Sequence, residues 1–246
     1  MNPPGTPLPL SAVLVMTLAA AGCQIDGGYP TGPAATESRS VELGDAKSVQ
    51  VELHMGAGEL KLAGGAKNLL DADFTYPLPR GKPDVRYRVT AGRGHLTIRQ
   101  PEGWGGPRGG RYVWDLRLKD NVPLELEVHL GAGRSDLTLG SLALTKLDVH
   151  MGVGECIVDL TGDWKEDLSA SIQGGIGSAT VRLPEDVGVK VRAKGGIGEI
   201  RRGPLKPQGD FYVNDAYGKS SVTLHVNIEG GIGEIRLEAS GAPPVV

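Results

Sequence analysis

The 246-residue chain contains only two cysteines, and aromatic residues make up 4% of it. So few thiols exclude the disulfide framework that holds many small secreted domains together. Beyond residue 22 the chain also lacks an apolar run long enough to span a bilayer and the 3.6-residue apolar periodicity of amphipathic helices. We therefore expect an all-β domain with a substantial core and neither disulfides nor membrane-spanning helices.

Motifs for phosphate binding and nucleophilic catalysis are missing as well. Glycine is abundant, at 38 residues, but no Gly-x-Gly continues as Gly-x-Gly-x-x-Gly or ends in Gly-Lys-Ser/Thr. No Ser/His/Asp or Cys/His arrangement suggests a nucleophile with its base. We therefore expect no enzymatic activity and no cofactor. A glutamate recurs after the second glycine of several pairs, and this repetition indicates a solvated edge rather than a catalytic acid and base. These residues are Glu59, Glu155, Glu199 and Glu234.

The first 22 residues have the pattern of an export signal. Residues 8–22 form a short apolar run that ends in small residues directly before Cys23, which predicts a signal peptide over residues 1–22. Ala20-Ala21-Gly22-Cys23 resembles the lipobox of bacterial lipoproteins. The resemblance implies cleavage before Cys23, acylation of its thiol by groups such as palmitate, and an extracytoplasmic, membrane-anchored location. Gln24 favours the outer membrane if the cell has two.

The ends of the mature chain have the composition of unfolded segments. Residues 23–41 are rich in Gly, Pro, Ser and Thr, and we interpret them as a flexible tether. Residues 240–246 are expected to be a disordered tail. With Cys23 acylated, Cys156 is the remaining thiol, and its parity predicts a small buried apolar side chain.

The most regular feature of the chain is a Gly-x-Gly that follows a short alternating apolar strand seven times. In the fourth case Leu147, Val149 and Met151 share one face, and beyond Gly154 the apolar residues have the opposite parity. Such a shift turns side chains to the wrong face unless the backbone bends, which glycine permits. Each repeat is therefore predicted to be strand, glycine corner, strand. The pairs are Gly56/Gly58, Gly92/Gly94, Gly131/Gly133, Gly152/Gly154, Gly175/Gly177, Gly196/Gly198 and Gly231/Gly233.

The spacing of these corners favours a solenoid. Successive corners in the middle of the chain lie 21–23 residues apart, and the longer intervals leave room for extra strands near residues 69–76, 112–118 and 211–217. We predict a parallel β-solenoid of stacked strands. An antiparallel β-sandwich or meander remains the alternative, because glycine corners do not fix the direction of pairing. Residues 42–120 are expected to be an irregular N-terminal β segment and residues 121–239 the regular solenoid.

Three histidines occupy equivalent positions before their corners, on the polar parity. They are predicted to point outward, and His129 and His150, in successive repeats, to lie about 4.8 Å apart. An exposed ladder is the favoured interpretation. A metal site is the alternative, although zinc needs three or four ligands and no third is evident nearby. The histidines are His54, His129 and His150.

A basic stretch is the main candidate for ligand binding. The chain has a formal charge of −3, yet residues 80–119 contain ten Lys or Arg against three acids, interleaved with aromatics. Because the chain has an export signal, we expect anionic headgroups or acidic wall polymers as partners and no nucleic acid. A solvated strand face is the alternative. The candidate surface consists of Arg86, Arg88, Arg108, Arg111 and Arg117.

Several stretches resemble the toast-rack family of bacterial envelope proteins, whose function is unknown. The resemblance covers about residues 42–238, and its C-terminal part is similar to the LiaF-like domain of cell-wall-active-antibiotic response proteins. It implies a β-solenoid-like fold and an extracytoplasmic setting, and it supplies no catalytic residues. The LiaF-like relatives imply a part in regulating an envelope-stress kinase. The resemblance rests on residues 54–60, 114–124, 150–155, 183–189 and 212–218.

These observations lead to one main functional hypothesis and two alternatives. The first is a non-enzymatic, lipid-anchored scaffold or binding module that contacts another envelope protein or an anionic polymer. The second is a regulator of envelope-stress signalling. The third is an enzyme acting on wall polysaccharide, since solenoid grooves can hold pairs of carboxylates.

Overall fold

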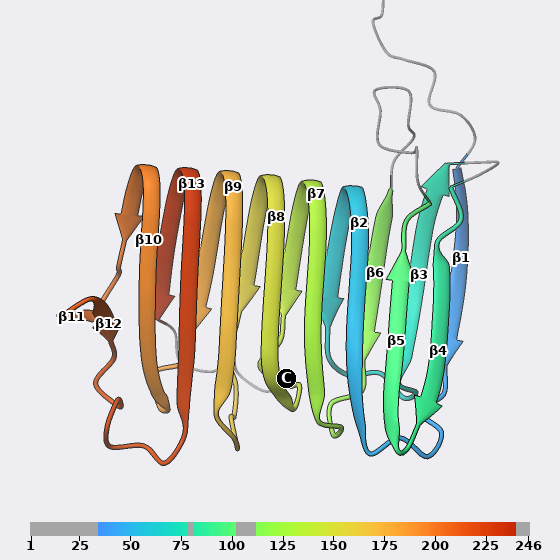
Figure 1. Ribbon diagram of the computed structural model, residues 1–246, viewed down its shortest axis with the longest axis horizontal. Coiled ribbons are helices and arrows are strands. Elements are labelled where there is room, and N and C mark those ends of the chain that lie inside the picture. Colours follow the sequence, from blue (N-terminus) through green and yellow to red (C-terminus); the bar gives the residue numbers. More distant parts are fainter. Residues whose placement is uncertain (1–33, 78–80, 102–111, 240–246) are drawn as a thin grey trace, which may run out of the picture.

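Strands dominate the computed structural model, which describes residues 34–77, 81–101 and 112–239 (Figure 1). Thirteen of them join in one mixed sheet, and no helix in the described ranges is long and apolar enough to cross a membrane. The strands are β1 (Ala34–Val41), β2 (Ser48–Ala63), β3 (Leu70–Pro77), β4 (Asp84–Thr90), β5 (Arg93–Arg99), β6 (Val113–Leu118), β7 (Leu124–Thr138), β8 (Leu144–Asp159), β9 (Leu168–Leu183), β10 (Gly188–Arg201), β11 (Lys206–Gln208), β12 (Phe211–Val213) and β13 (Thr223–Ala239).

Six long strands, β2, β7, β8, β9, β10 and β13, bend at a Gly-x-Gly corner and continue beyond it, as Figure 1 shows at the top of the view. The half of each strand before the corner contributes to one wall, called here the first wall, and the half after it to the second wall. Neighbouring coils pair in parallel with their corners in register. The all-β, solenoid-like fold predicted from the sequence is therefore confirmed.

The change of parity at each corner keeps one core between the two walls. In β8, Leu147, Val149 and Met151 are buried before the corner, and Cys156 and Val158 are buried after it. The second glycine of all six corners has a φ between +132° and +152°, which glycine adopts without the steric cost that a Cβ would bring. The prediction that Cys156 is buried is confirmed, since only 2% of it is exposed.

The first corner, in β2, differs from the later corners in the neighbour that lies against Gly58. In the later corners the second glycine lies against the second glycine of a neighbouring coil, whereas Gly58 lies against Tyr112: a Cβ added to Gly58 would stand 2.8 Å from the Tyr112 carbonyl oxygen. The Glu59 amide donates to that same carbonyl at 2.9 Å. Gly58 has the φ of a corner, at +152°, and stacks in register with Gly133, as predicted. It belongs to the last coil of the row, and the chain that leads into β6 covers it where a further coil would stack.

Shorter strands extend both walls at the β1 end of the solenoid. On the second wall β6 pairs in parallel with β2, and β3 and β1 follow as antiparallel strands. On the first wall β5 pairs in parallel with β2, and β4 pairs antiparallel with β5. Strands β3 and β6 match two of the extra strands expected from the sequence, and Trp114 of β6 packs edge-on against Phe74 of β3, with ring centroids 5.7 Å apart.

Two further predictions about this end are wrong. Gly92/Gly94 is not a corner, because Ala91 and Gly92, both with positive φ, form the tight turn of the β4–β5 hairpin. The tether does not reach residue 41, because residues 34–41 form β1. The polar composition of these residues did not indicate a strand, because its pairing depends on a distant partner. The Ser38 and Ser40 hydroxyls donate hydrogen bonds to aspartates of β3 across the sheet. The rest of the predicted tether, residues 1–22 and residues 240–246 lie outside the described residues.

The order of the last coils also differs from the expected succession of repeats. Strand β13 lies between β9 and β10, so that β10 is the outermost coil and β12 and β11 follow it (Figure 1). Both halves of β13 carry buried apolar residues, such as Val226, Ile228 and Leu237, which suits a position with neighbours on both sides. Residues 194–199 of β10 are exposed, which suits an edge.

Candidate functional site

The outer face of the first wall carries a ladder of three histidines. Parallel pairing of β2, β7 and β8 places His54 opposite His129 and His129 opposite His150. Each pair of rings is stacked, with centroids 4.8 Å apart and planes inclined by 3° and 7°. The outward-facing ladder predicted for His129 and His150 is confirmed, with their rings stacked and both residues half-buried. The inclusion of His54 follows from the pairing of β2 with β7, which sequence spacing did not show.

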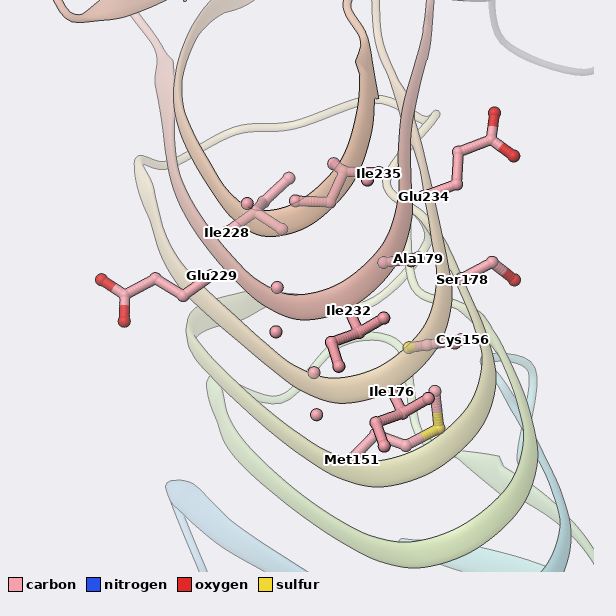
Figure 2. Close-up of a pocket in the computed structure, with 18 of the residues that line it drawn as sticks. Met151, Cys156, Ile176, Ser178, Ala179, Ile228, Glu229, Ile232, Glu234 and Ile235 are labelled. Atoms are coloured by element: carbon pink, nitrogen blue, oxygen red, sulfur yellow. The ribbon is translucent and has the colours of Figure 1, made fainter.

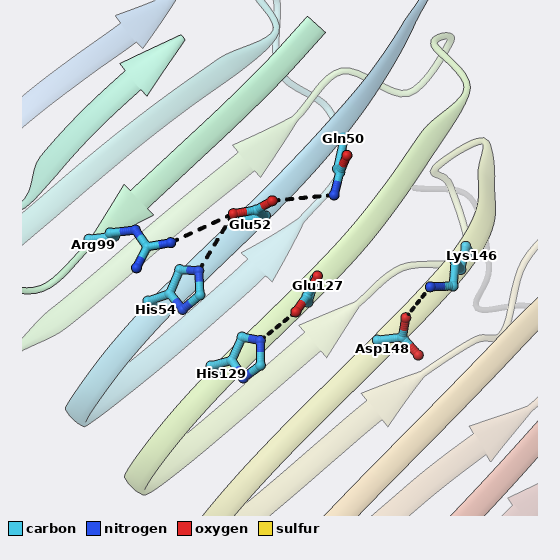
Figure 3. A network of polar contacts seen from close by, with 8 residues as sticks. All are labelled: Gln50, Glu52, His54, Arg99, Glu127, His129, Lys146 and Asp148. Atoms are coloured by element: carbon cyan, nitrogen blue, oxygen red, sulfur yellow. Dashed lines mark hydrogen bonds and ion pairs between the residues drawn. The ribbon is translucent and has the colours of Figure 1, made fainter. Parts of the chain in front are cut away.

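A second row of acidic residues runs beside the histidines, two residues earlier in each strand. Glu52, Glu127 and Asp148 are opposite one another in the register. Glu127 contacts the Nε2 atom of His129 at 2.6 Å, while Asp148 pairs with Lys146 at 2.6 Å (Figure 3). The wall thus has one stripe of imidazoles beside one stripe of carboxylates, both running along the solenoid axis.

The imidazole of His54 is more enclosed than that of His129, with 28% of its side chain exposed against 37%. Burial is the main cause that lowers the pKa of His54, and the positive charges of Arg99 and His129 lower it further. Glu52 acts in the opposite direction, from 3.7 Å away. The neutral imidazole of His54 is therefore favoured relative to a free histidine.

The stacked geometry does not suit a metal shared between the histidines. Each pair of rings is nearly parallel, with planes inclined by 3° and 7°, so their nitrogens do not converge on one point between them. Over the described ranges no three His, Cys, Asp or Glu side chains are grouped so that they could hold a metal ion.

A groove of about 700 Å³ opens where the β4–β5 hairpin meets β2 on the same wall. Its basic lining comes from Arg86, Arg88 and Arg99. Arg86 pairs with Asp84 at 2.6 Å and Arg99 approaches Glu52 at 3.8 Å, whereas Arg88 has no carboxylate partner within the part of the chain that the structure describes. The complete lining, called here the arginine groove, is Glu52, Arg86, Arg88, Thr90, His95, Thr97 and Arg99.

The arginine groove contains only part of the predicted basic surface. Arg86 and Arg88 lie in it, but Arg117 lies on β6, which pairs with the second half of β2 and so belongs to the second wall. The expectation of one surface is therefore wrong for Arg117, because the two halves of β2 face opposite sides of the core. Arg108 and Arg111 lie outside the described residues.

Sequence reasoning missed the contribution of β5 to this groove. His95, Thr97 and Arg99 alternate with the buried Leu96 and Ile98, so their outward direction was available from parity. What the sequence did not show was the parallel pairing of β5 with β2, which brings these three side chains next to Glu52.

The recurrent glutamates lie on the second wall and are engaged in ion pairs. Glu155 pairs with Arg134 of the neighbouring coil at 2.5 Å. Glu234 pairs with Arg236 at 2.9 Å and with Arg201 at 3.0 Å, and Arg201 also pairs with Glu199 at 3.0 Å. These contacts support the interpretation of the row as a charged, solvated edge.

Comparison with known proteins shows one family and several solved structures. Residues 30–182 match the N-terminal domain of toast_rack, DUF2154. A proposed cell adhesion protein from Clostridium sporogenes shares 33% identity with a TM-score of 0.81, over 85% of this chain and 100% of that one. A proposed adhesin from Bacteroides fragilis shares 10% identity with a TM-score of 0.32, over 85% and 98%. A proposed lipid binding protein from Parabacteroides distasonis shares 13% identity with a TM-score of 0.30, over 86% and 96%. No curated protein matches the sequence.

Proposed function

The chain belongs to the toast-rack family, and from this premise we propose that it is a non-enzymatic binding module of the cell envelope. The arginine groove is its binding site, and an anionic polymer of the envelope is its ligand. The observation that supports this most is that three guanidinium groups line a groove containing a single carboxylate, Glu52. The relative from Clostridium sporogenes is a proposed cell adhesion protein, a role that also depends on a binding surface.

The chemistry of the arginine groove matches phosphate or carboxylate groups. Guanidinium groups donate paired hydrogen bonds to such anions, and the hydroxyls of Thr90 and Thr97 add neutral donors. Arg88 has no ion-pair partner to give up within the described residues, so an anion that binds it displaces only water. Because the side chains are largely exposed, salt will weaken the interaction strongly.

The module is held at a membrane by a lipid on Cys23. The lipobox-like sequence before Cys23 supports cleavage and acylation there, with palmitate among the acyl groups. Two acyl chains are enough for stable anchoring, whereas a single chain binds a bilayer only reversibly. The remaining tether, residues 23–33, would hold the solenoid outside the cytoplasm, at the outer membrane if the cell has two.

The arginine groove is tested by binding of fluorescein-labelled poly(glycerol phosphate) to the full chain. Arg88→Glu is expected to raise the Kd about tenfold at a salt concentration of about 0.05 M. Arg117→Glu is the matched control, because it makes the same change of charge on the opposite wall, and it should have a much smaller effect. Equal effects of the two variants would mean that net charge, and not the groove, governs binding.

The anchor is tested separately in cells. Cys23→Ser is expected to move the protein from the membrane fraction to the soluble fraction, and mass spectrometry of the wild-type N-terminus should show an acylated Cys23. A mature protein that begins elsewhere would exclude the anchor without affecting the groove.

A second candidate function is the regulation of an envelope-stress signalling system. It is favoured by the LiaF-like segment Tyr212–Gly218, where Asn214 fastens the outermost coil by hydrogen bonds to Val187 and Val189. Because these contacts stabilise the fold, they support shared architecture more directly than shared signalling. A stress reporter that changes on deletion of the gene, with no loss of polymer binding, would favour this second role. Hydrolysis of wall polysaccharide by the purified protein would overturn the non-enzymatic proposal.

A further inference from the structure

Four large aliphatic side chains are exposed in the described part of the chain, and all four lie at the same position of a corner. Each stands between the two glycines, with 51% of Val153, 53% of Ile176, 50% of Ile232 and 72% of Ile197 exposed. Parallel pairing places them opposite one another in the order β8, β9, β13, β10. They form a straight row of about 14 Å, given the 4.8 Å spacing of strands, called here the aliphatic ridge.

The corner itself does not require these large side chains. The same position holds Ala57 in β2 and Ala132 in β7, where the backbone also bends at a second glycine with positive φ. Exposing half of an isoleucine gives up part of the free energy that its burial would contribute, so the fold alone gives no reason for the ridge.

The corners that carry the ridge lack a large apolar side chain at the position just before the first glycine. The residue before the first glycine is Met151 in β8, but Gly174, Gly230 and Gly195 occupy that register position in the next three coils. A hollow of about 40 Å³ remains there, lined by Met151 and its neighbours (Figure 2). Figure 2 labels Ile176 and Ile232 among the residues that line it. The corners of β9 and β13 thus carry a large aliphatic side chain at the exposed tip and no side chain at the register position where β8 has the buried Met151.

The chain enters the fold on the same edge. Thr36 of β1 pairs with Thr75 of β3, which pairs with Val113 of β6, which pairs with Glu59 next to the first corner. The start of β1 therefore lies on the corner edge. Cys23 precedes Ala34 by eleven residues, a segment that reaches about 40 Å at most. A lipid on Cys23 would hold the corner edge within reach of the bilayer.

We propose that the aliphatic ridge is a membrane-contact edge, whose side chains insert between the headgroups of the bilayer that anchors the protein. The inference rests on the proposed function, because the anchor brings this edge to the membrane. Carboxylates beside the ridge, such as Glu155 and Glu234, are paired with arginines. Insertion is therefore apolar in character and, unlike binding in the arginine groove, insensitive to salt and suited to zwitterionic lipid.

The test uses the mature chain, residues 23–246, with Cys23→Ser, which removes both the signal peptide and the lipid, and vesicles of pure phosphatidylcholine. Full burial of an isoleucine changes a partition constant roughly ten- to hundredfold, so removing two half-exposed ones with Ile176→Ser and Ile232→Ser should lower partitioning at least about tenfold. Ile157→Ser on the outer face of the second wall is the matched control and should leave partitioning unchanged. Partitioning should also persist at high salt.

A second measurement keeps the proposal testable if the double variant is unstable. A solvent-sensitive dye attached to Ile176→Cys should shift to the blue on adding vesicles, while the same dye on Ile157→Cys should not; Cys156 is buried and will react slowly. No shift at residue 176, or equal partitioning of both serine variants, overturns the proposal. Self-association without lipid that the ridge variant abolishes also overturns it, because the ridge would then bind a second copy. An unacylated Cys23 in cells would instead refute the proposed anchor and leave the vesicle result standing.

Discussion

Gly154 lies directly against Gly133 of the neighbouring coil: a Cβ added to Gly154 would stand 1.8 Å from the Gly133 carbonyl oxygen. The φ of Gly154 is +137°, a conformation that residues with a Cβ rarely adopt. Two independent constraints, the close approach of two backbones and the sign of φ, thus require glycine at this position.

Gly154→Ala is therefore expected to destabilise the fold by about 3 kcal/mol or more. The close contact is with backbone, so neither coil can relieve it by a change of rotamer. Urea unfolding followed by circular dichroism measures the loss. A free energy of unfolding within about 1 kcal/mol of wild type would contradict the stacked geometry of the corners.

Gly174→Ala should have the opposite sign. A Cβ at Gly174 meets no atom within 4 Å, and its φ lies outside the left-handed region. Alanine restricts the unfolded chain and places a methyl group beside the hollow at the corner, which together should stabilise the fold by about 0.5–1 kcal/mol. Urea unfolding measures the free energy of unfolding of this variant as well. A destabilised variant would mean that the hollow is not open to the new methyl group.

The corners and the parity of the core were predictable because both depend on local chemistry. An apolar set that changes parity at a Gly-x-Gly allows few backbones, so the buried positions of β8 on both sides of Gly154 followed from the sequence. The outward direction of His129 and His150 followed for the same reason. The cover over Gly58 did not, because Tyr112 is distant in the sequence and reaches the corner only through the pairing of β6 with β2.

The order of the coils was not predictable in this way. Strands β10 and β13 have the same corner sequence, Gly-Gly-Ile-Gly-Glu-Ile-Arg. Either strand could therefore pair with β9. The choice depends on which strand loses less free energy of burial when it lies at the edge of the sheet. It therefore depends on the stability of two complete arrangements, which no short segment of the sequence reveals. The separation of Arg117 from Arg88 has a similar origin, since it depends on which half of β2 each neighbouring strand joins.

The motifs most specific for the family turn out to be structural. Trp114 is completely buried and packs on Phe74. Asn214 bridges the chain before β10 to the turn after β12. These residues identify the architecture, whereas the arginine groove depends on exposed side chains that carry no such motif, which is why the family resemblance did not locate it.

Asn214→Ala is expected to destabilise the outermost coil. The side-chain amide of Asn214 donates to the Val187 carbonyl at 2.7 Å, and its carbonyl oxygen accepts from the Val189 and Tyr217 amides at 3.0 Å each. Loss of these bonds should cost about 2–3 kcal/mol. Hydrogen exchange should quicken first in β10 and β12. Asn214→Asp keeps the two acceptor contacts and should therefore lose less stability than Asn214→Ala. If Asn214→Asp is as unstable as Asn214→Ala, the effect comes from the lost donor alone.

The thiol of Cys156 should be unreactive in the folded protein. Burial raises the pKa of Cys156 to about 11, and 2% of the residue is exposed, so neither thiolate nor access is available near neutral pH. In a Cys23→Ser background, alkylation by iodoacetamide should follow global unfolding, with no reaction in buffer and complete reaction in urea. Rapid alkylation of folded protein would mean that the corner beside Cys156 opens locally.

The histidine ladder should make stability depend on pH through His54. The pKa of His54 is lowered in the folded state, chiefly by burial and then by Arg99 and His129, so the unfolded chain binds the proton more readily. The corresponding stabilisation is fully present above the unfolded pKa of about 6.5 and is lost as the pH falls through the folded value. Wild-type Tm should therefore decrease between neutral and acidic pH, and His54→Gln should decrease less. His225→Gln, an exposed histidine of β13 outside the ladder, is the control and should behave as wild type. If His54→Gln and His225→Gln have the same pH profile as wild type, the cost of charging the stacked ring is too small to matter, and the acid sensitivity belongs to the carboxylates.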